Sequence, residues 1–217
     1  KPEPEPQPSG DNVTKDGVQI PYDITGNIEY KFHHNDRKDG KRIDFEKLKP
    51  NTFVDSVVLG YFAFPNGEAP NDEVSGKWSV ETHSDGTDPK CYDGGVDIKS
   101  GESRWRFESP HPKYHKLTED FIVKGTPLDK KFVGYMFIRQ TLPDGTVRLE
   151  AWQDAGDNEG IKPSNKWVKL NSYIDKKYKV TKYPNGPEIT IRVDGKNVVE
   201  DMKYKWVACV ELKPLSE

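Results

Sequence analysis

Aromatic rings alternate with arginine and glutamate side chains in the segment FVGYMFIRQTLPDGTVRLEAWQD, residues 132–154. Sugar rings present C–H faces that stack on aromatic side chains, and sugar hydroxyls need fixed donors and acceptors such as guanidinium and carboxylate groups. These residue types at this spacing therefore point to carbohydrate recognition. The candidate contacts are Tyr135, Phe137, Arg139, Arg148, Glu150 and Trp152, with Lys31, His33, Arg104 and Arg106 extending the same surface.

A second chemistry that these residue types allow is the cleavage of a uronate polymer by β-elimination. Such a reaction needs a cation to neutralise the carboxylate, a base to remove the C5 proton and an acid to protonate the leaving oxygen. The candidate catalytic residues are Arg106, Tyr114, His115 and Arg139. The opposing interpretation is that the histidines of this region lie in a solvated loop, because Ser109-Pro110-His111-Pro112 has loop composition.

Carboxylates that cluster near glycines suggest a structural calcium ion, since Ca²⁺ is bound by several hard oxygen ligands. The candidate ligands are Asp93, Asp97, Asp154 and Asp157. Aspartate and glycine are also the ordinary residues of surface turns, so both interpretations stay open. The sequence contains no EF-hand, zinc, P-loop or dinucleotide-binding signature, and no cofactor is expected to be required.

The loop between the two strands of the segment 132–154 decides which side chains share a face. With a four-residue loop at residues 143–146, Leu142 pairs with Val147 and Arg139 pairs with Glu150. One face is then apolar and the other carries the aromatic and charged residues. We predict this register, because cross-strand ion pairs and aromatic pairs stabilise a sheet.

A three-residue loop at residues 143–145 with a bulge is the competing register. It shifts the pairing by one residue and places Leu149 beside Arg139. Because a one-residue slip exchanges the faces of a strand, this register mixes apolar and polar side chains on both faces. The alternation in the sequence therefore disfavours it.

The elements that position these residues are expected to be short strands separated by turns. The strand-like segments are residues 28–33, 53–64, 78–82, 104–108, 132–142, 147–153, 167–173, 188–193 and 205–212. Turn residues such as Asp85-Gly86 and Asp194-Gly195 lie between them, and helical periodicity is nearly absent. The pattern predicts an all-β, two-sheet antiparallel jelly-roll sandwich.

The first residues, KPEPEPQPSG, form a Pro- and Glu-rich spacer, because alternating prolines enforce an extended chain. We assign residues 1–12 to the spacer and 13–217 to one sandwich domain. Spacers of this composition are typical of tethered proteins, which favours an extracellular or cell-surface location. No apolar run is long enough to span a bilayer.

Charge and cysteine content narrow the classes of partner. The chain has 33 basic and 36 acidic side chains in interleaved order, so nucleic acid is not an expected partner. The two cysteines, Cys91 and Cys209, fit neither a metal knuckle nor a CxxC pair. One long-range disulfide and two unlinked thiols both remain open.

The strand, turn and strand VGYMFIRQTLPDGTVRLEAWQD and the closing strand KWVACVELK resemble the concanavalin-A-like lectin/glucanase superfamily of jelly rolls. The run GGVDIK at residues 94–99, followed by RWRFESPHPKY, adds to this resemblance. The superfamily includes glycan-binding modules and alginate-lyase-like domains. The resemblance implies two packed antiparallel sheets, a concave glycan-binding face and, in some members, a structural calcium. The catalytic strand motifs of its hydrolases and lyases are absent, so the resemblance does not by itself transfer a catalytic role to this chain.

Three functions are therefore expected in order of preference. The first is binding of a polysaccharide or other glycan through a concave aromatic, arginine and glutamate face, without catalysis. The second is a polysaccharide lyase acting on uronate polymers on the same scaffold. The third is a structural subunit of a surface layer or filament that self-assembles through the N-terminal spacer.

Overall fold

The structure is a computed structural model of the 217-residue chain. It describes residues 12–37, 40–45, 48–64, 73–79, 90–109, 113–118, 123–128, 130–156, 159–184, 186–194 and 202–215. The predicted spacer lies outside these residues except for Asn12, which is buried and whose Nδ2 donates a hydrogen bond of 3.0 Å to Asp23 Oδ1.

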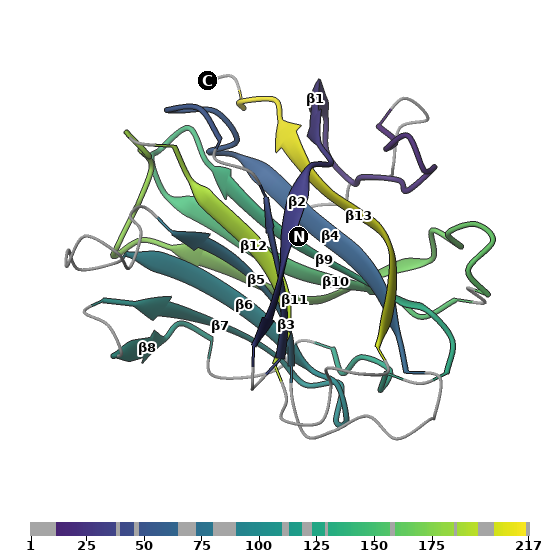
Figure 1. Cartoon of the computed structure of the whole chain (residues 1–217). Helices are drawn as coiled ribbons and strands as arrows, with labels where there is room; N and C mark the ends of the chain where they lie inside the picture. Colours follow the sequence, from purple (N-terminus) through teal and green to yellow (C-terminus); the bar gives the residue numbers. More distant parts are fainter. Residues whose placement is uncertain are drawn as a thin grey trace, which may run out of the picture.

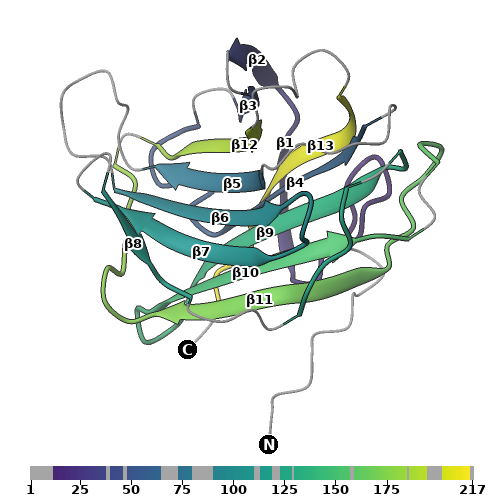
Figure 2. The same ribbon diagram turned by 90° about the horizontal axis from the view of Figure 1, so that it is seen from below.

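Two antiparallel sheets face each other and form a sandwich (Figures 1 and 2). In spatial order, the six-stranded sheet consists of β1 (Ile24–Glu29), β13 (Lys203–Leu212), β4 (Ser56–Ala63), β9 (Val133–Thr141), β10 (Val147–Asp154) and β11 (Trp167–Asp175). The seven-stranded sheet consists of β2 (Phe32–Arg37), β3 (Gly40–Phe45), β12 (Glu188–Asp194), β5 (Glu73–Ser79), β6 (Cys91–Asp97), β7 (Ser103–Glu108) and β8 (Tyr114–Lys116). The predicted all-β sandwich is confirmed.

The main core lies between the two sheets and is rich in aromatic side chains. Trp105 of β7 and Phe137 of β9 meet edge to face across the sheets, with ring centroids 6.3 Å apart. Glycines allow this close approach: a Cβ atom on Gly76 would lie 2.8 Å from Phe137, and one on Gly94 would lie 2.7 Å from Trp105. The close packing of large rings compensates for the low aliphatic content of the chain.

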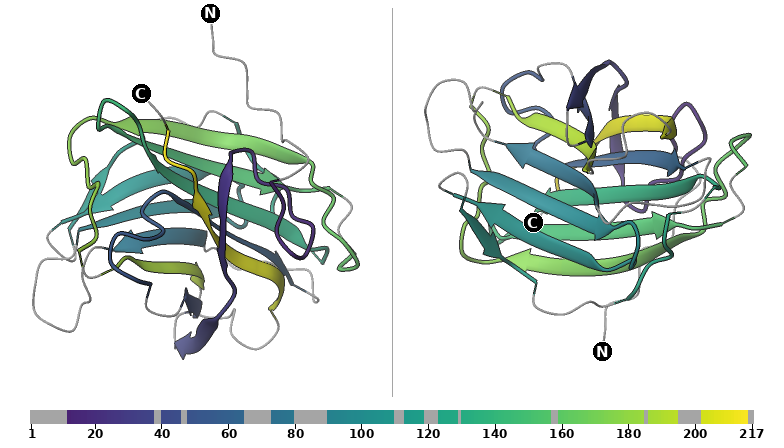
Figure 3. Two further views of the ribbon diagram at one scale, coloured as in Figure 1. Left: turned by 90° about the horizontal axis from the view of Figure 1, so that it is seen from above. Right: turned by 60° about the horizontal axis from the view of Figure 1, so that its bottom comes forward.

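A second apolar cluster covers the opposite, outer face of the six-stranded sheet. The segment before β1 packs on this face, and its Val18 and Ile20 are fully buried there. Figure 3 shows the segment, in purple, beside β1 and β13. Strands β9 and β10 are therefore buried on both faces, and their side chains on both faces contact apolar neighbours.

The predicted register of the β9–β10 hairpin is wrong, and the competing register is observed. Leu149 pairs with Arg139, and the loop has three residues closed by the N–H of Leu142, which lies 2.8 Å from the carbonyl of Thr146. Gly145 has a φ of 75°, which the third residue of such a loop requires. The argument from alternation failed because it assumed one solvated face, whereas both faces of this hairpin are covered.

Both cysteines are free thiols in buried positions, Cys91 on β6 and Cys209 on β13. They belong to different sheets, and this resolves the question that the sequence left open. Among the residues that the structure describes, no helix is long and apolar enough to cross a membrane.

Candidate functional site

The predicted aromatic and charged face of the hairpin does not exist as one surface. Tyr135 and Phe137 are fully buried between the sheets, whereas Glu150 and Trp152 point to the other side of β10, beneath the segment that precedes β1. The shift of one residue in the register separates the two sets. The structure therefore does not bring these predicted sugar contacts together.

Arg139 is a structural residue in the sandwich interior. Its side chain is fully buried, its Nη1 donates to the carbonyl of Val54 at 2.7 Å and to Asp55 Oδ1 at 2.6 Å, and its Nη2 donates to the carbonyl of Val180. A buried guanidinium with a carboxylate and two carbonyl partners ties loops to the sheet. It has no route to a polymer on the surface.

The residues on the outer side of β10 are held by the N-terminal segment. The hydroxyl of Tyr22 donates to Glu150 at 2.9 Å, and the indole Nε1 of Trp152 donates to the same carboxylate at 2.9 Å. Lys169 Nζ lies 3.2 Å from Glu150, and the guanidinium of Arg148 lies 5.4 Å from the centre of the Tyr22 ring. These contacts fasten the segment to the sheet and leave little surface for a ligand.

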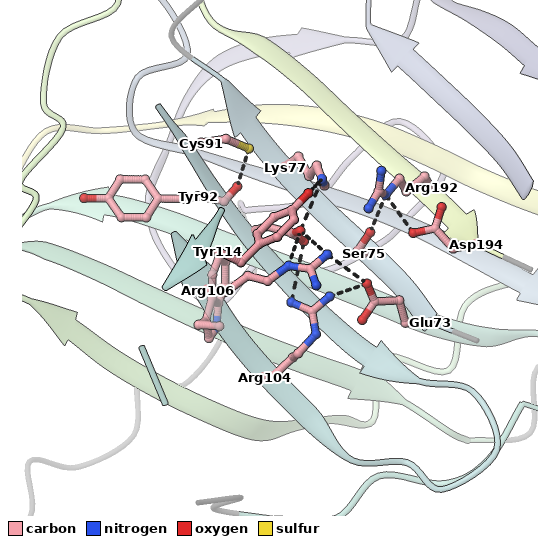
Figure 4. A network of polar contacts seen from close by, with 12 residues as sticks. Glu73, Ser75, Lys77, Cys91, Tyr92, Arg104, Arg106, Tyr114, Arg192 and Asp194 are labelled. Atoms are coloured by element: carbon pink, nitrogen blue, oxygen red, sulfur yellow. Dashed lines mark hydrogen bonds and ion pairs between the residues drawn. The ribbon is translucent and has the colours of Figure 1, made fainter. Parts of the chain in front are cut away.

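Another surface, on the outer face of the seven-stranded sheet, gathers charged side chains at half-buried positions (Figure 4). In each strand, alternate residues point inward to the core, and the intervening polar residues point outward. We call this surface the charged face. It consists of Glu73, Ser75, Lys77, Asp93, Arg104, Arg106, Glu108, Tyr114, Arg192 and Asp194.

Asp93 lies at the centre of the charged face, and its side chain is fully buried. Its Oδ2 lies 2.7 Å from Arg106 Nη2 and 3.2 Å from Lys77 Nζ. Burial alone raises the pKa of this carboxyl, but the surrounding Lys77 and arginine cations outweigh burial and lower the pKa to about 2. Asp93 is therefore a permanent anion that holds the cations in place.

Glu73 is the second anion of the network. It bonds to Arg104, and its Oε1 lies 3.5 Å from Arg106 Nη2. Burial raises the pKa of the Glu73 carboxyl and is the largest effect. The positive charge of Arg104 lowers this pKa, but the net result is a pKa above the ordinary value. The neighbouring Gly95 leaves room for this pair, because a Cβ atom there would lie 2.5 Å from Glu73 Oε2.

The edges of the charged face are formed by Arg192 on one side and Tyr114 on the other. Arg192 Nε donates to Ser75 Oγ at 3.1 Å and lies 2.9 Å from Asp194 Oδ2. Tyr114 is 37% exposed, and its ring covers the guanidinium of Arg106 at 3.9 Å. The charged face thus combines four cations and four carboxylates with one partly exposed ring.

Two polar atoms in the middle of the charged face have no hydrogen-bond partner among the residues that the structure describes. They are Asp93 Oδ1 and Arg104 Nη1, which lie 3.9 Å apart. One is an acceptor and the other is a donor. A hydroxyl group, like a water molecule, donates and accepts at once and can satisfy both atoms.

Of the extension residues predicted from the sequence, Arg104 and Arg106 lie on the charged face. His33 is exposed on β2 and pairs with Asp44, whereas Lys31 is exposed just before that strand. Lys77, Arg192 and Glu73 were missed, although the polar alternation of EVSGKWS and ITIRVD was a signal that could have found them.

The residues predicted for β-elimination are not assembled. Arg106 and Tyr114 are neighbours on the charged face, but His115 points to the inner side of the sheet, where its Nε2 lies 2.9 Å from the carbonyl of Ser109 and its ring faces Tyr178. Arg139 belongs to the other sheet. Burial also raises the pKa of Tyr114, so its phenol keeps its proton at neutral pH and is no base.

The three predicted calcium ligands that the structure describes do not lie together around one point. Asp93 is surrounded by cations, Asp97 accepts the N–H groups of Lys99 and Ser100, and Asp154 accepts the hydroxyl of Tyr61. Asp157 lies outside the described residues. Within the described part of the chain, no three His, Cys, Asp or Glu residues are grouped as metal ligands, and the calcium ion stays a prediction.

No protein-family model matches the chain, and no curated protein matches it. Among solved structures, the chain is similar to the Bacillus licheniformis β-glucanase, with a TM-score of 0.35 and 9% identity over 80% of this chain and 68% of that one. It is also similar to the endo-β-1,4-glucuronan lyase of the fungus Trichoderma reesei, with a TM-score of 0.38 and 10% identity over 85% and 77% of the two chains. A third similar structure is the winged bean acidic lectin in complex with methyl-α-D-galactose, with a TM-score of 0.30 and 7% identity over 93% and 89%. These similarities concern the fold alone and assign no activity to this chain.

Proposed function

We propose that this chain binds an anionic glycan on the charged face of its seven-stranded sheet. The observation that carries the proposal is the loose ion pair between Asp93 Oδ1 and Arg104 Nη1, which are 3.9 Å apart and have no hydrogen-bond partner among the described residues. Burying polar atoms without partners costs free energy, and a bound sugar hydroxyl removes that cost at both atoms. Because the side chain of Arg104 is 25% exposed, a small shift of its guanidinium admits the hydroxyl.

The guanidinium groups of the charged face favour a negatively charged sugar. The cations of Arg104, Arg106, Arg192 and Lys77 are matched in number by the carboxylates of Glu73, Asp93, Glu108 and Asp194, so the preference rests on guanidinium geometry and not on net charge. Planar guanidinium groups bind carboxylates and sulfates with two parallel hydrogen bonds. A uronate carboxylate can therefore replace Glu73 at Arg104 and Arg106.

The order of the side chains across the sheet favours a polymer. One row of paired residues runs over all seven strands at right angles to them: His33, Asp44, Thr190, Lys77, Asp93, Arg106 and Lys116. At the usual strand spacing this row is roughly 29 Å long. A linear polysaccharide laid across the strands meets one polar side chain per strand, so several consecutive sugar units are held at once.

Binding without cleavage is the function that this geometry supports. The charged face offers cations and a protonated tyrosine, but the candidate histidine faces away from it.

The proposal retains an extracellular location, for which the support is the Pro- and Glu-rich spacer at residues 1–10. Self-assembly through that spacer remains a separate prediction. Deletion of residues 1–10 tests it, and the expected result is loss of assembly while the domain stays folded.

Affinity electrophoresis in gels that contain a polysaccharide tests the proposal. The expected result is strong retardation by polygalacturonate, weaker retardation by the same polymer after methyl esterification, and none by dextran. Retardation by polygalacturonate should decrease as salt is added, because counterions screen the exposed cations. Equal mobility in all three gels would refute glycan binding by the charged face.

A further inference from the structure

A pocket of about 410 Å³ lies at the start of β11, the edge strand of the six-stranded sheet. It is separate from the charged face, because it is built from the other sheet and from the segments beside it. Its lining includes Lys124, Gly125, Gln153, Lys166, Val168 and Leu170. Its volume is within the range of small-molecule sites.

The wall of the pocket is fixed in place by hydrogen bonds. The side chain of Gln153, which is buried, accepts from the N–H of Thr126 at 2.6 Å and donates to its carbonyl at 2.8 Å. The N–H of Val123 donates to the carbonyl of Leu170 at 2.9 Å, and the N–H of Gly125 donates to the carbonyl of Gly101 at 2.8 Å. The cavity is therefore preformed and does not depend on the folding of a loop around a ligand.

The pocket is positively charged. Lys124 and Lys166 are both exposed, and neither forms an ion pair or hydrogen bond within the described part of the chain. The carboxylate of the adjacent strand, Asp154, forms no ion pair with either lysine and accepts from Tyr61, from the N–H of Gly156 at 3.0 Å and from the N–H of Asn165 at 2.9 Å. Because no carboxylate of the described residues pairs with these two lysines, they favour a ligand that carries a negatively charged group.

The floor of the pocket is apolar. Val168 is 51% exposed at this position, although it lies on a strand, and Leu170 lies next to it. An apolar floor beneath two cations suits a ligand that has a C–H face and an anionic group on the same ring. We propose that this pocket binds a single uronate sugar unit, as a second glycan site distinct from the charged face.

An NMR titration of the labelled full-length chain tests the proposal with glucuronate as the probe. The expected result is a saturable shift of the amide signals of Gly125, Gly156 and Val168, with no comparable shift from glucose, which lacks the charge, or from acetate, which lacks the ring. In Lys124→Ala/Lys166→Ala, the affinity for glucuronate should fall at least fivefold. Lys176→Ala/Lys177→Ala, which removes two exposed lysines beyond the far end of β11, is the matched control and should bind as the unchanged chain does.

A second variant separates loss of binding from loss of folding. Val168→Glu places a negative charge on the exposed floor, and it should abolish the shifts caused by glucuronate while the remaining amide spectrum stays folded. Lysines beside an edge strand also prevent strand pairing between molecules. If Lys124→Ala/Lys166→Ala binds glucuronate with unchanged affinity, the proposal is overturned, and self-association of this variant would show that the lysines only protect the edge. Equal shifts with acetate also overturn it. Neither result bears on polygalacturonate binding by the charged face, which Lys124 and Lys166 do not touch.

Discussion

The guanidinium of Arg106 lies 3.9 Å from the centre of the Tyr114 ring, and the same guanidinium bonds to the buried carboxylate of Asp93. The ring therefore covers the cation on one side while its own outer surface faces solvent. This arrangement joins a stacking surface to a charged group, which are the two elements that recognition of an anionic sugar requires.

Tyr114→Ala should weaken binding of polygalacturonate, because it removes the stacking surface and uncovers Arg106. Tyr114→Phe should retain most of the affinity, since the ring stays and only the contact of its hydroxyl with Lys77 at 3.4 Å is lost. A cation and ring at an exposed position stabilise each other by about 0.5–1 kcal/mol, so the folded domain should lose little stability in either variant. Isothermal titration of both variants measures the difference. Equal loss in the two variants would argue against stacking.

Glu73→Gln should strengthen binding of polygalacturonate at neutral pH and make it less dependent on pH. The pKa of Glu73 is raised, so its carboxylate takes up a proton as the pH falls towards that raised value, and each protonation removes a negative charge from the charged face. In the unchanged chain, affinity for the anionic polymer should therefore rise as the pH falls. Titrations at several pH values check this, and an identical pH profile for Glu73→Gln would contradict the role of Glu73.

The adjacent residues Gly94 and Gly95 should respond to alanine in different ways, because they face opposite sides of β6. A Cβ atom on Gly94 meets the Trp105 ring at 2.7 Å in the core, so Gly94→Ala should destabilise the domain by about 1–3 kcal/mol. A Cβ atom on Gly95 meets the flexible end of Glu73, so Gly95→Ala should cost little stability and should disturb glycan binding. Urea unfolding and titration of both variants separate the two effects. The reverse pattern would show that the faces of β6 are assigned incorrectly.

Arg139→Ala should strongly destabilise the fold without a direct effect on glycan affinity. It leaves the partly buried Asp55 without its cation and opens a gap where the Arg139 side chain lay, and breaking a buried ion pair costs about 3–5 kcal/mol. Urea unfolding measures the loss, with Arg148→Ala on the outer side of β10 as the control. A folded Arg139→Ala domain of unchanged stability would contradict the buried position of this residue.

The sandwich could be predicted from the sequence because short strands and turns alternate along the whole chain. The faces of the β9–β10 hairpin could not be predicted from the sequence. Nothing in the residues up to the end of the segment ITGNIE indicated that Val18 and Ile20 cover the second face of β9 and β10. Arg104 and Arg106 were found because their alternation with Trp105 is visible locally. Their partner Asp93 comes from the preceding strand β6, whereas Glu73 and the nearby Arg192 come from strands farther away in the sequence, and the strand order β12-β5-β6-β7 brings them together.

The most direct test of the central claim is the affinity of Arg104→Ala/Arg106→Ala for polygalacturonate, measured by isothermal titration beside Arg148→Ala. Arg104 and Arg106 are half-buried on the charged face, whereas Arg148 lies on the outer face of the other sheet, against Tyr22. We predict that the double variant loses at least tenfold in affinity while Arg148→Ala binds like the unchanged chain. Unchanged binding by a folded double variant, or an equal loss in Arg148→Ala, would contradict the assignment of the glycan site to the charged face.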